Sequence, residues 1–85
     1  MAENKKTRIT VEINRTRYTI VGDESEEHVK EVARLVNDKM EEVRSANQHL
    51  DTSRLAVLTA LNTMNDYVKL KKEHETLLAM LEEDK

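Results

Sequence analysis

The chain has 85 residues, of which 38% are hydrophobic and 36% charged, with two Tyr and no Phe, Trp or Cys. This length allows one domain, and without large aromatic side chains or disulfides a core of this size is hard to stabilise alone, so we expect an obligate oligomer. The net charge of −3, with both signs interspersed, argues against binding to nucleic acid or to an anionic membrane.

The amino-terminal residues 1–6 are polar, and we expect them to be disordered. Lys5 and Lys6 are followed by no apolar segment, so this start does not have the pattern of a signal peptide. No later stretch approaches the ~20 apolar residues of a membrane span. Together with the absence of cysteine, these features predict a cytoplasmic protein that does not insert into a membrane.

Two short runs, residues 7–13 and 16–21, place an apolar side chain at every second position, which is typical of half-buried strands. The apolar side chains are Ile9, Val11 and Ile13 in the first run and Tyr18 and Ile20 in the second. A two-residue turn at Asn14-Arg15 would pair the runs so that all five share one face. Asn tolerates the positive φ of a primed turn, whereas Arg suits it less well than Gly. We therefore predict a β-hairpin.

A helix is predicted after Gly22, which breaks the second strand. Asp23 or Ser25 can cap it. Apolar side chains then recur at three- and four-residue steps as far as Val43, which is the pattern of an amphipathic helix. We expect the helix to run from about Glu26 to about Ser45.

A second, longer helix should begin after Asp51, which is a good N-cap. No Pro or Gly follows Gly22, so nothing ends this helix before the carboxyl terminus, and its ~33 residues would span roughly 50 Å. Beyond Val68 its apolar stripe narrows to the three- and four-residue steps of a coiled-coil seam, which only another chain can bury. The expected dimer interface comprises Leu61, Met64, Tyr67, Leu70, His74, Leu77 and Leu81.

The predicted fold class is therefore α+β, a β-hairpin followed by two helices (ββαα). Residues 7–66 should form the head domain, and residues 67–85 a coiled-coil extension of the second helix.

The sequence contains no recognisable set of catalytic residues. The three His, at positions 28, 49 and 74, lack the spacing of metal ligands, and the lone Gly22 does not make a phosphate loop. We predict no enzyme activity, no cofactor and no metal. His74 lies in the predicted seam, where setting the helix register is a simpler role than acting as a pH switch.

Basic side chains on the hairpin and first helix are the candidate partner-binding residues. A nucleic-acid site would need a face of one sign, preferably with aromatic residues, so a protein partner with a mixed or acidic surface fits better. The candidates are Arg15, Arg17, Lys30, Arg34 and Arg44.

Three segments, taken in order, resemble the ZapA family of Z-ring-associated cell-division proteins. They are the hairpin at residues 11–20, the stretch Val36-Asn37-Asp38-Lys39-Met40, and the Leu-x-x-x-x-Ala-Leu-Asn run at residues 55–62. The resemblance covers roughly residues 7–81. It implies a ββαα head, a homodimer held by the second helix, and a non-enzymatic adaptor. Such an adaptor binds FtsZ polymers at mid-cell and crosslinks or aligns their protofilaments, promoting Z-ring assembly.

The resemblance also ranks the candidate residues. Arg44 matches a basic position of the family and becomes the first candidate for filament contact, whereas Arg15 stands where the family commonly has a turn Gly. Longer relatives form dimers of dimers through the coiled coil, so a tetramer is a second option for this shorter chain. The alternative function is a generic dimeric coiled-coil module with another protein partner, which only the resemblance separates from the first.

Overall fold

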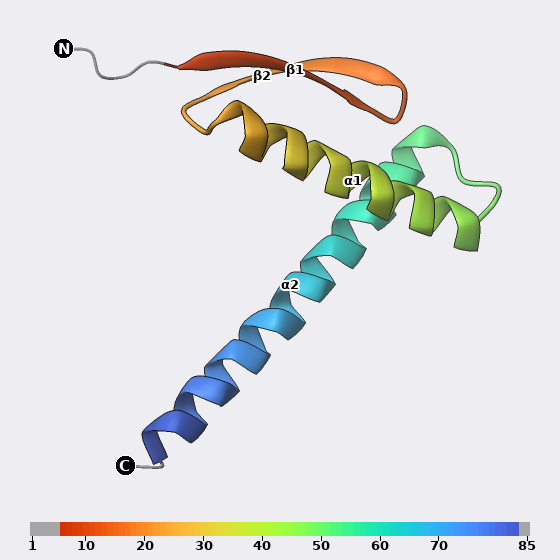
Figure 1. Cartoon of the computed structure of the whole chain (residues 1–85). Helices are drawn as coiled ribbons and strands as arrows, with labels where there is room; N and C mark the ends of the chain where they lie inside the picture. The colour runs from red at the N-terminus through yellow and green to blue at the C-terminus, as the bar shows by residue number, and fades with distance from the viewer. Residues whose placement is uncertain (1–5, 84–85) are drawn as a thin grey trace.

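The computed structural model describes residues 6–83, which form four elements in the predicted order. These are β1 (Thr7–Ile13), β2 (Thr16–Gly22), α1 (Glu26–Ala46) and α2 (Thr52–Glu83). The α+β class and the long second helix are therefore confirmed (Figure 1). Apart from Lys6, the segment expected to be disordered lies outside the described residues, as do the last two residues of the coiled-coil extension.

The hairpin has the predicted register and turn. The two strands pair antiparallel with Val11 opposite Tyr18 and Ile9 opposite Ile20. Asn14 and Arg15 connect them with φ angles of 54° and 66°. Positive φ at both central residues is what a primed hairpin turn requires, because its twist matches that of the strands.

Burial in the hairpin is uneven between the two strands. Ile9 and Val11 are only 6% and 7% exposed, whereas their partners Ile20 and Tyr18 are 39% and 48% exposed. The four side chains share a face, but α1 packs against β1 more than against β2. The apolar side chains of β2 therefore lie at the open side of the head.

Both helices begin at the predicted caps. The Ser25 hydroxyl accepts a hydrogen bond from the backbone N–H of His28 at 3.1 Å. The Asp51 carboxylate accepts one from the N–H of Arg54 at 2.8 Å. Each cap satisfies a backbone donor that has no partner within its own helix. Helix α1 ends at Ala46, one residue beyond the expected end.

Two small apolar clusters lie along α1. The first contains Ile9, Val11 and Ala33 and lies between β1 and α1. The second contains Met40, Val43 and Leu55 and lies between α1 and the start of α2. Ile13 packs against both clusters and joins them.

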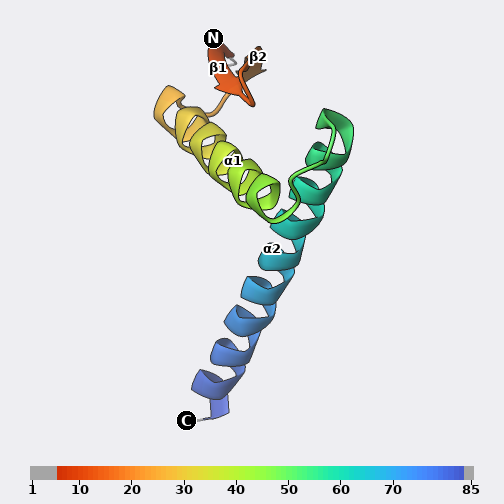
Figure 2. The ribbon, with the colours of Figure 1, turned by 90° about the vertical axis from the view of Figure 1, so that its right-hand side faces the viewer.

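Helix α2 crosses α1 near the amino-terminal end of α2, and the rest of α2 then extends away from the head (Figures 1 and 2). It has 32 residues and is about 48 Å long. Leu55 and Thr59 are its buried residues, and every described residue from 60 onward is exposed. The Nζ of Lys39 on α1 lies 2.7 Å from Asp66 Oδ2 on α2, and this hydrogen bond raises the pKa of Lys39 and lowers that of Asp66.

The resulting molecule is flat and open, with extents of 51 × 50 × 16 Å. Its radius of gyration is 17.4 Å, whereas a compact domain of this length has a radius of about 12 Å. Its accessible surface is 7381 Å², against about 5,200 Å² for a compact monomer of its mass. An excess of about 2,000 Å² is the scale of surface that stable assemblies bury.

Replacing Arg15 with Gly should raise the free energy of unfolding by about 0.5–1 kcal/mol, because Gly has no Cβ to strain the positive φ of the turn. Urea denaturation at a fixed protein concentration measures this. Arg17→Gly is the matched control, since it lies in the extended strand β2 and should lower stability. A destabilised Arg15→Gly chain would contradict the primed turn.

Candidate functional site

The hairpin turn is tied to α1 by two polar side chains, Asn37 and Arg44, which we call the turn clamp. Asn37 Oδ1 accepts a hydrogen bond from the backbone N–H of Asn14 at 2.9 Å, and Asn37 Nδ2 donates to the carbonyl of Glu12 at 2.7 Å. Two helical turns later, Arg44 donates to the side-chain oxygen of Asn14 and pairs with Glu41. The turn is therefore held in one orientation relative to α1.

The clamp gives Arg44 a role that the sequence does not indicate. The sequence predicts an exposed arginine that contacts a partner, whereas in the structure its guanidinium already has two partners within the head. Asn37 is not among the predicted site residues at all. The available signal is its position one turn after Ala33 and one before Met40, because a polar residue beside buried neighbours needs a hydrogen-bonding partner.

Arg15 and Arg17 project at the tip of the hairpin, next to the clamp. Arg15 and Arg44 line a shallow hollow of about 190 Å³ beside the turn. Arg17 stands opposite Glu12 in the strand register. Both side chains are exposed, and the ion pairs found among residues 6–83 use other basic residues. The tip of the hairpin thus offers exposed positive charge to a partner.

Lys30 and Arg34 lie elsewhere on α1 and are already paired. Lys30 Nζ is 2.8 Å from Glu26, and Arg34 contacts Glu31 at 2.8 Å and Asp38 at 3.2 Å. The hydrogen bond from Lys30 lowers the pKa of Glu26, and the bond to Glu31 raises the pKa of Arg34. These exposed pairs add little stability but neutralise the local charge. The five basic candidates therefore do not form one positive patch.

The predicted interface residues of α2 are all exposed, but they divide between two faces of the helix. The distal seam consists of Tyr67, Leu70, His74, Leu77 and Leu81, which follow each other at three- and four-residue steps. Leu61 and Met64 precede it by three-residue steps only, and each such step rotates the position by about 60° around the helix. They belong instead to a proximal face, which consists of Val57, Leu61, Met64 and Val68.

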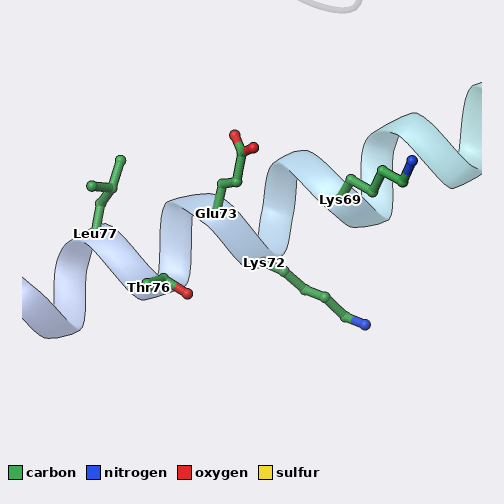
Figure 3. A pocket seen from close by; sticks show the side chains of 5 residues that line it. All are labelled: Lys69, Lys72, Glu73, Thr76 and Leu77. Carbon is green, nitrogen blue, oxygen red and sulfur yellow. The ribbon is translucent and has the colours of Figure 1, made fainter.

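No other element within residues 6–83 covers the distal part of α2. Figure 3 shows Glu73 and Leu77 projecting from one side of the bare helix, and Lys72 and Thr76 from another. The depression that they line with Lys69 is formed by α2 alone, so no second element encloses a ligand there. Leu77 is 60% exposed. Such a surface suits a helix–helix contact better than a small molecule.

Two features of the described residues limit the chemistry that this part of the chain can support. Among the residues that the structure describes, no three His, Cys, Asp or Glu side chains are grouped so that they could hold a metal ion. Within the same part of the chain, neither helix combines the length and the apolar character needed to cross a membrane.

Comparisons with known proteins give one consistent result. The family model "Cell division protein ZapA" matches residues 9–85. A cell division protein ZapA of Oceanobacillus iheyensis is 57% identical over 81 residues, covering 95% of this chain and 94% of the relative. A ZapA of Geobacillus sp. is 53% identical over 85 residues, covering 100% and 98%. The solved structure "ZapA mutant dimer from Geobacillus stearothermophilus" is similar with a TM-score of 0.73 and 45% identity, over 96% of this chain and 95% of that one.

Replacing Asn37 with Ala should lower the free energy of unfolding by about 1–2 kcal/mol, because the N–H of Asn14 and the carbonyl of Glu12 both lose their partner. Chemical denaturation at fixed concentration measures the loss. Asn62→Ala is the control, since that side chain bonds only to a carbonyl of its own helix. Equal stability of the two variants would show that the clamp does not hold the turn.

Proposed function

Because the chain belongs to the ZapA family of cell division proteins, we propose that it is a non-enzymatic adaptor that binds FtsZ polymers and crosslinks or aligns their protofilaments. In this role it promotes Z-ring assembly and acts in the cytoplasm at the mid-cell division site. The observation that carries the proposal is that the family match spans both the head and the long helix α2. A crosslinker needs a binding surface and a contact that joins two copies of that surface. The head can supply the first and α2 the second.

Two copies of the binding surface require a homodimer, and the exposed apolar surface of α2 supports one. The distal seam has coiled-coil spacing, and its side chains have no cover within residues 6–83. A solved relative with a similar fold is described as a dimer. We propose that two copies pair along this seam, with His74 as a polar register position.

The filament contact is proposed at the tip of the hairpin. Arg15 and Arg17 offer exposed positive charge there, and Arg44 stands beside them while it holds the turn. Lys30 and Arg34 are weaker candidates, because an acidic partner would have to displace their present carboxylate partners. An acidic or mixed surface on the filament would complement this tip.

Crosslinking then follows from symmetry. A twofold dimer presents the same hairpin tip twice, so it can bind two protofilaments or two sites on one. The second contact is intramolecular once the first has formed, which raises the overall affinity without a strong single contact.

Replacing both Leu77 and Leu81 with Lys should convert the dimer to monomer and lower its thermal stability. The change removes two apolar contacts and places like charges across a symmetric seam. Sedimentation velocity across a range of concentrations measures the mass. Lys69→Ala is a mild control on the same helix and should keep the dimer. A double variant with unchanged mass would rule out the distal seam as the dimer contact.

Reversing both charges at the tip, with Arg15→Glu and Arg17→Glu, should reduce co-sedimentation with FtsZ polymers at least tenfold while the dimer persists. Positive charge at the proposed contact becomes negative, which repels an acidic partner. Lys6→Glu with Arg8→Glu is the matched control, because it makes the same charge change at the opposite end of the hairpin.

Equal binding by both double variants would exclude the hairpin tip as the filament contact. An unmodified dimer that leaves FtsZ polymer mass and bundle width unchanged at saturation would instead favour the alternative, a dimeric coiled-coil module with another protein partner.

A further inference from the structure

The side chain of Asn37 makes two hydrogen bonds to the backbone of the hairpin, and both lie at the end that carries the turn. Its oxygen accepts from the N–H of Asn14 at 2.9 Å, and its nitrogen donates to the carbonyl of Glu12 at 2.7 Å. Backbone groups alternate in direction along a strand, so this carbonyl, next to the Ile13–Thr16 pair, faces away from β2. The carboxamide therefore occupies a position that a third strand would take beside β1.

A contact that served stability alone would not need this arrangement. Asn37 is half-buried and lies about one helical turn from the buried Ala33 and Met40. An apolar side chain at this position could pack against the hairpin and hold it to α1, but apolar contacts have no preferred direction. Two hydrogen bonds from one planar group, by contrast, fix both the distance and the rotation of the turn. What Asn37 adds is therefore orientation.

The residue that is oriented in this way is Arg15. Asn14 precedes it and is held at two points, its N–H by Asn37 and its side-chain oxygen by Arg44. Arg15 follows directly with a φ of 66°. Arg15, Asn37 and Arg44 line the same hollow of about 190 Å³ beside the turn. A tip that is rigid before it binds loses less conformational entropy on binding, so the turn clamp would raise its affinity for a partner.

We propose that Asn37 is a positioning residue of the filament contact, which holds the hairpin tip so that Arg15 and Arg17 meet the filament in one fixed orientation. The inference rests on the tip contact of the proposed function and adds the residue that prepares it. Asn37 acts through the backbone of residues 12 and 14 and does not itself have to touch the filament. Its loss should therefore weaken binding independently of its effect on stability.

A pair of variants, Asn37→Ala and Asn37→Leu, separates positioning from packing. Neither side chain can form the two hydrogen bonds, but Leu has a similar size to Asn and restores apolar contact with the hairpin. Asn37→Leu should be more stable than Asn37→Ala in urea denaturation, yet co-sedimentation of both variants with FtsZ polymers should fall at least fivefold. Binding that recovers together with stability in Asn37→Leu would overturn the proposal.

Ile9→Val is the matched control for a loss of stability in the same strand. Ile9 is 6% exposed and packs against α1 far from the turn, so the truncation destabilises the head without touching the tip. At a temperature at which circular dichroism shows all variants to be folded, Ile9→Val should bind FtsZ polymers normally. An equal loss of binding in Ile9→Val and Asn37→Ala would assign the effect to stability and overturn the proposal.

Hydrogen exchange tests the clamp without the filament. The N–H of Asn14 should exchange at least tenfold faster in Asn37→Leu than in the unmodified chain at the same pH, because its acceptor is lost. The N–H of Val11, which pairs with Tyr18 within the hairpin, should keep its rate. Equal exchange of the Asn14 N–H in the two chains would contradict a role of Asn37 in holding the turn.

The positioning role and the tip contact fail in different ways. If Arg15→Glu with Arg17→Glu weakens FtsZ binding but Asn37→Leu does not, the tip contact stands and the positioning role is wrong. If Asn37→Leu alone weakens binding, Asn37 acts elsewhere and both are wrong. If neither variant changes binding, the tip contact is excluded, and the positioning role with it.

Discussion

Within residues 6–83, helix α1 packs against both the hairpin and α2, and the rest of the fold depends on how it divides its apolar side. Ala33 is used against β1, whereas Met40 and Val43 are used against α2, and Ile13 joins the two clusters. Neither cluster is large, because the chain has no Phe or Trp to fill it. Helix α1 forms a layer that is one helix thick and has two faces. The hairpin and α2 of the same chain do not cover both faces. Exposed apolar surface is therefore a consequence of the topology and not a defect of packing.

The polar residues of the head fall into two groups with different roles. Asn37 and Arg44 are committed to the hairpin turn, and Lys30 and Arg34 are committed to neighbouring carboxylates. Arg15 is exposed at the tip, in a backbone conformation that is unfavourable for any residue with a Cβ. A residue that strains its own turn and has no partner among residues 6–83 is more consistent with recognition than with stability. This contrast supports the proposal that the filament contact lies at the tip rather than along α1.

The local features of the fold could be predicted from the sequence, because short-range chemistry determines them. The alternation of Ile9 and Val11 with polar residues sets the hairpin register, and Ser25 and Asp51 mark where the helices begin. The long-range features could not be predicted. That Asn37 reaches Asn14, 23 residues away, depends on where α1 crosses the hairpin.

The proposed dimer surface of α2 shows the same limit of prediction from sequence. Leu61 and Met64 continue the apolar run of α2 and are naturally grouped with Tyr67 and Leu70, yet successive three-residue steps carry them onto another face. The distinction matters only once α1 covers part of α2, because that contact decides which faces remain open. Periodicity identifies apolar side chains, and tertiary packing decides which partner each of them meets.

The pair of Lys39 and Asp66 completes the link between head and helix. It is partly exposed, so as an ion pair it adds a modest restraint on how the two helices are oriented. Because it contacts α2 seven residues beyond Thr59, it resists a change in the angle at which the helix leaves the head. In the proposed dimer that angle sets the distance between the two hairpin tips. A crosslinker whose tips are held at a fixed separation aligns filaments at a fixed spacing, whereas a flexible link would only gather them.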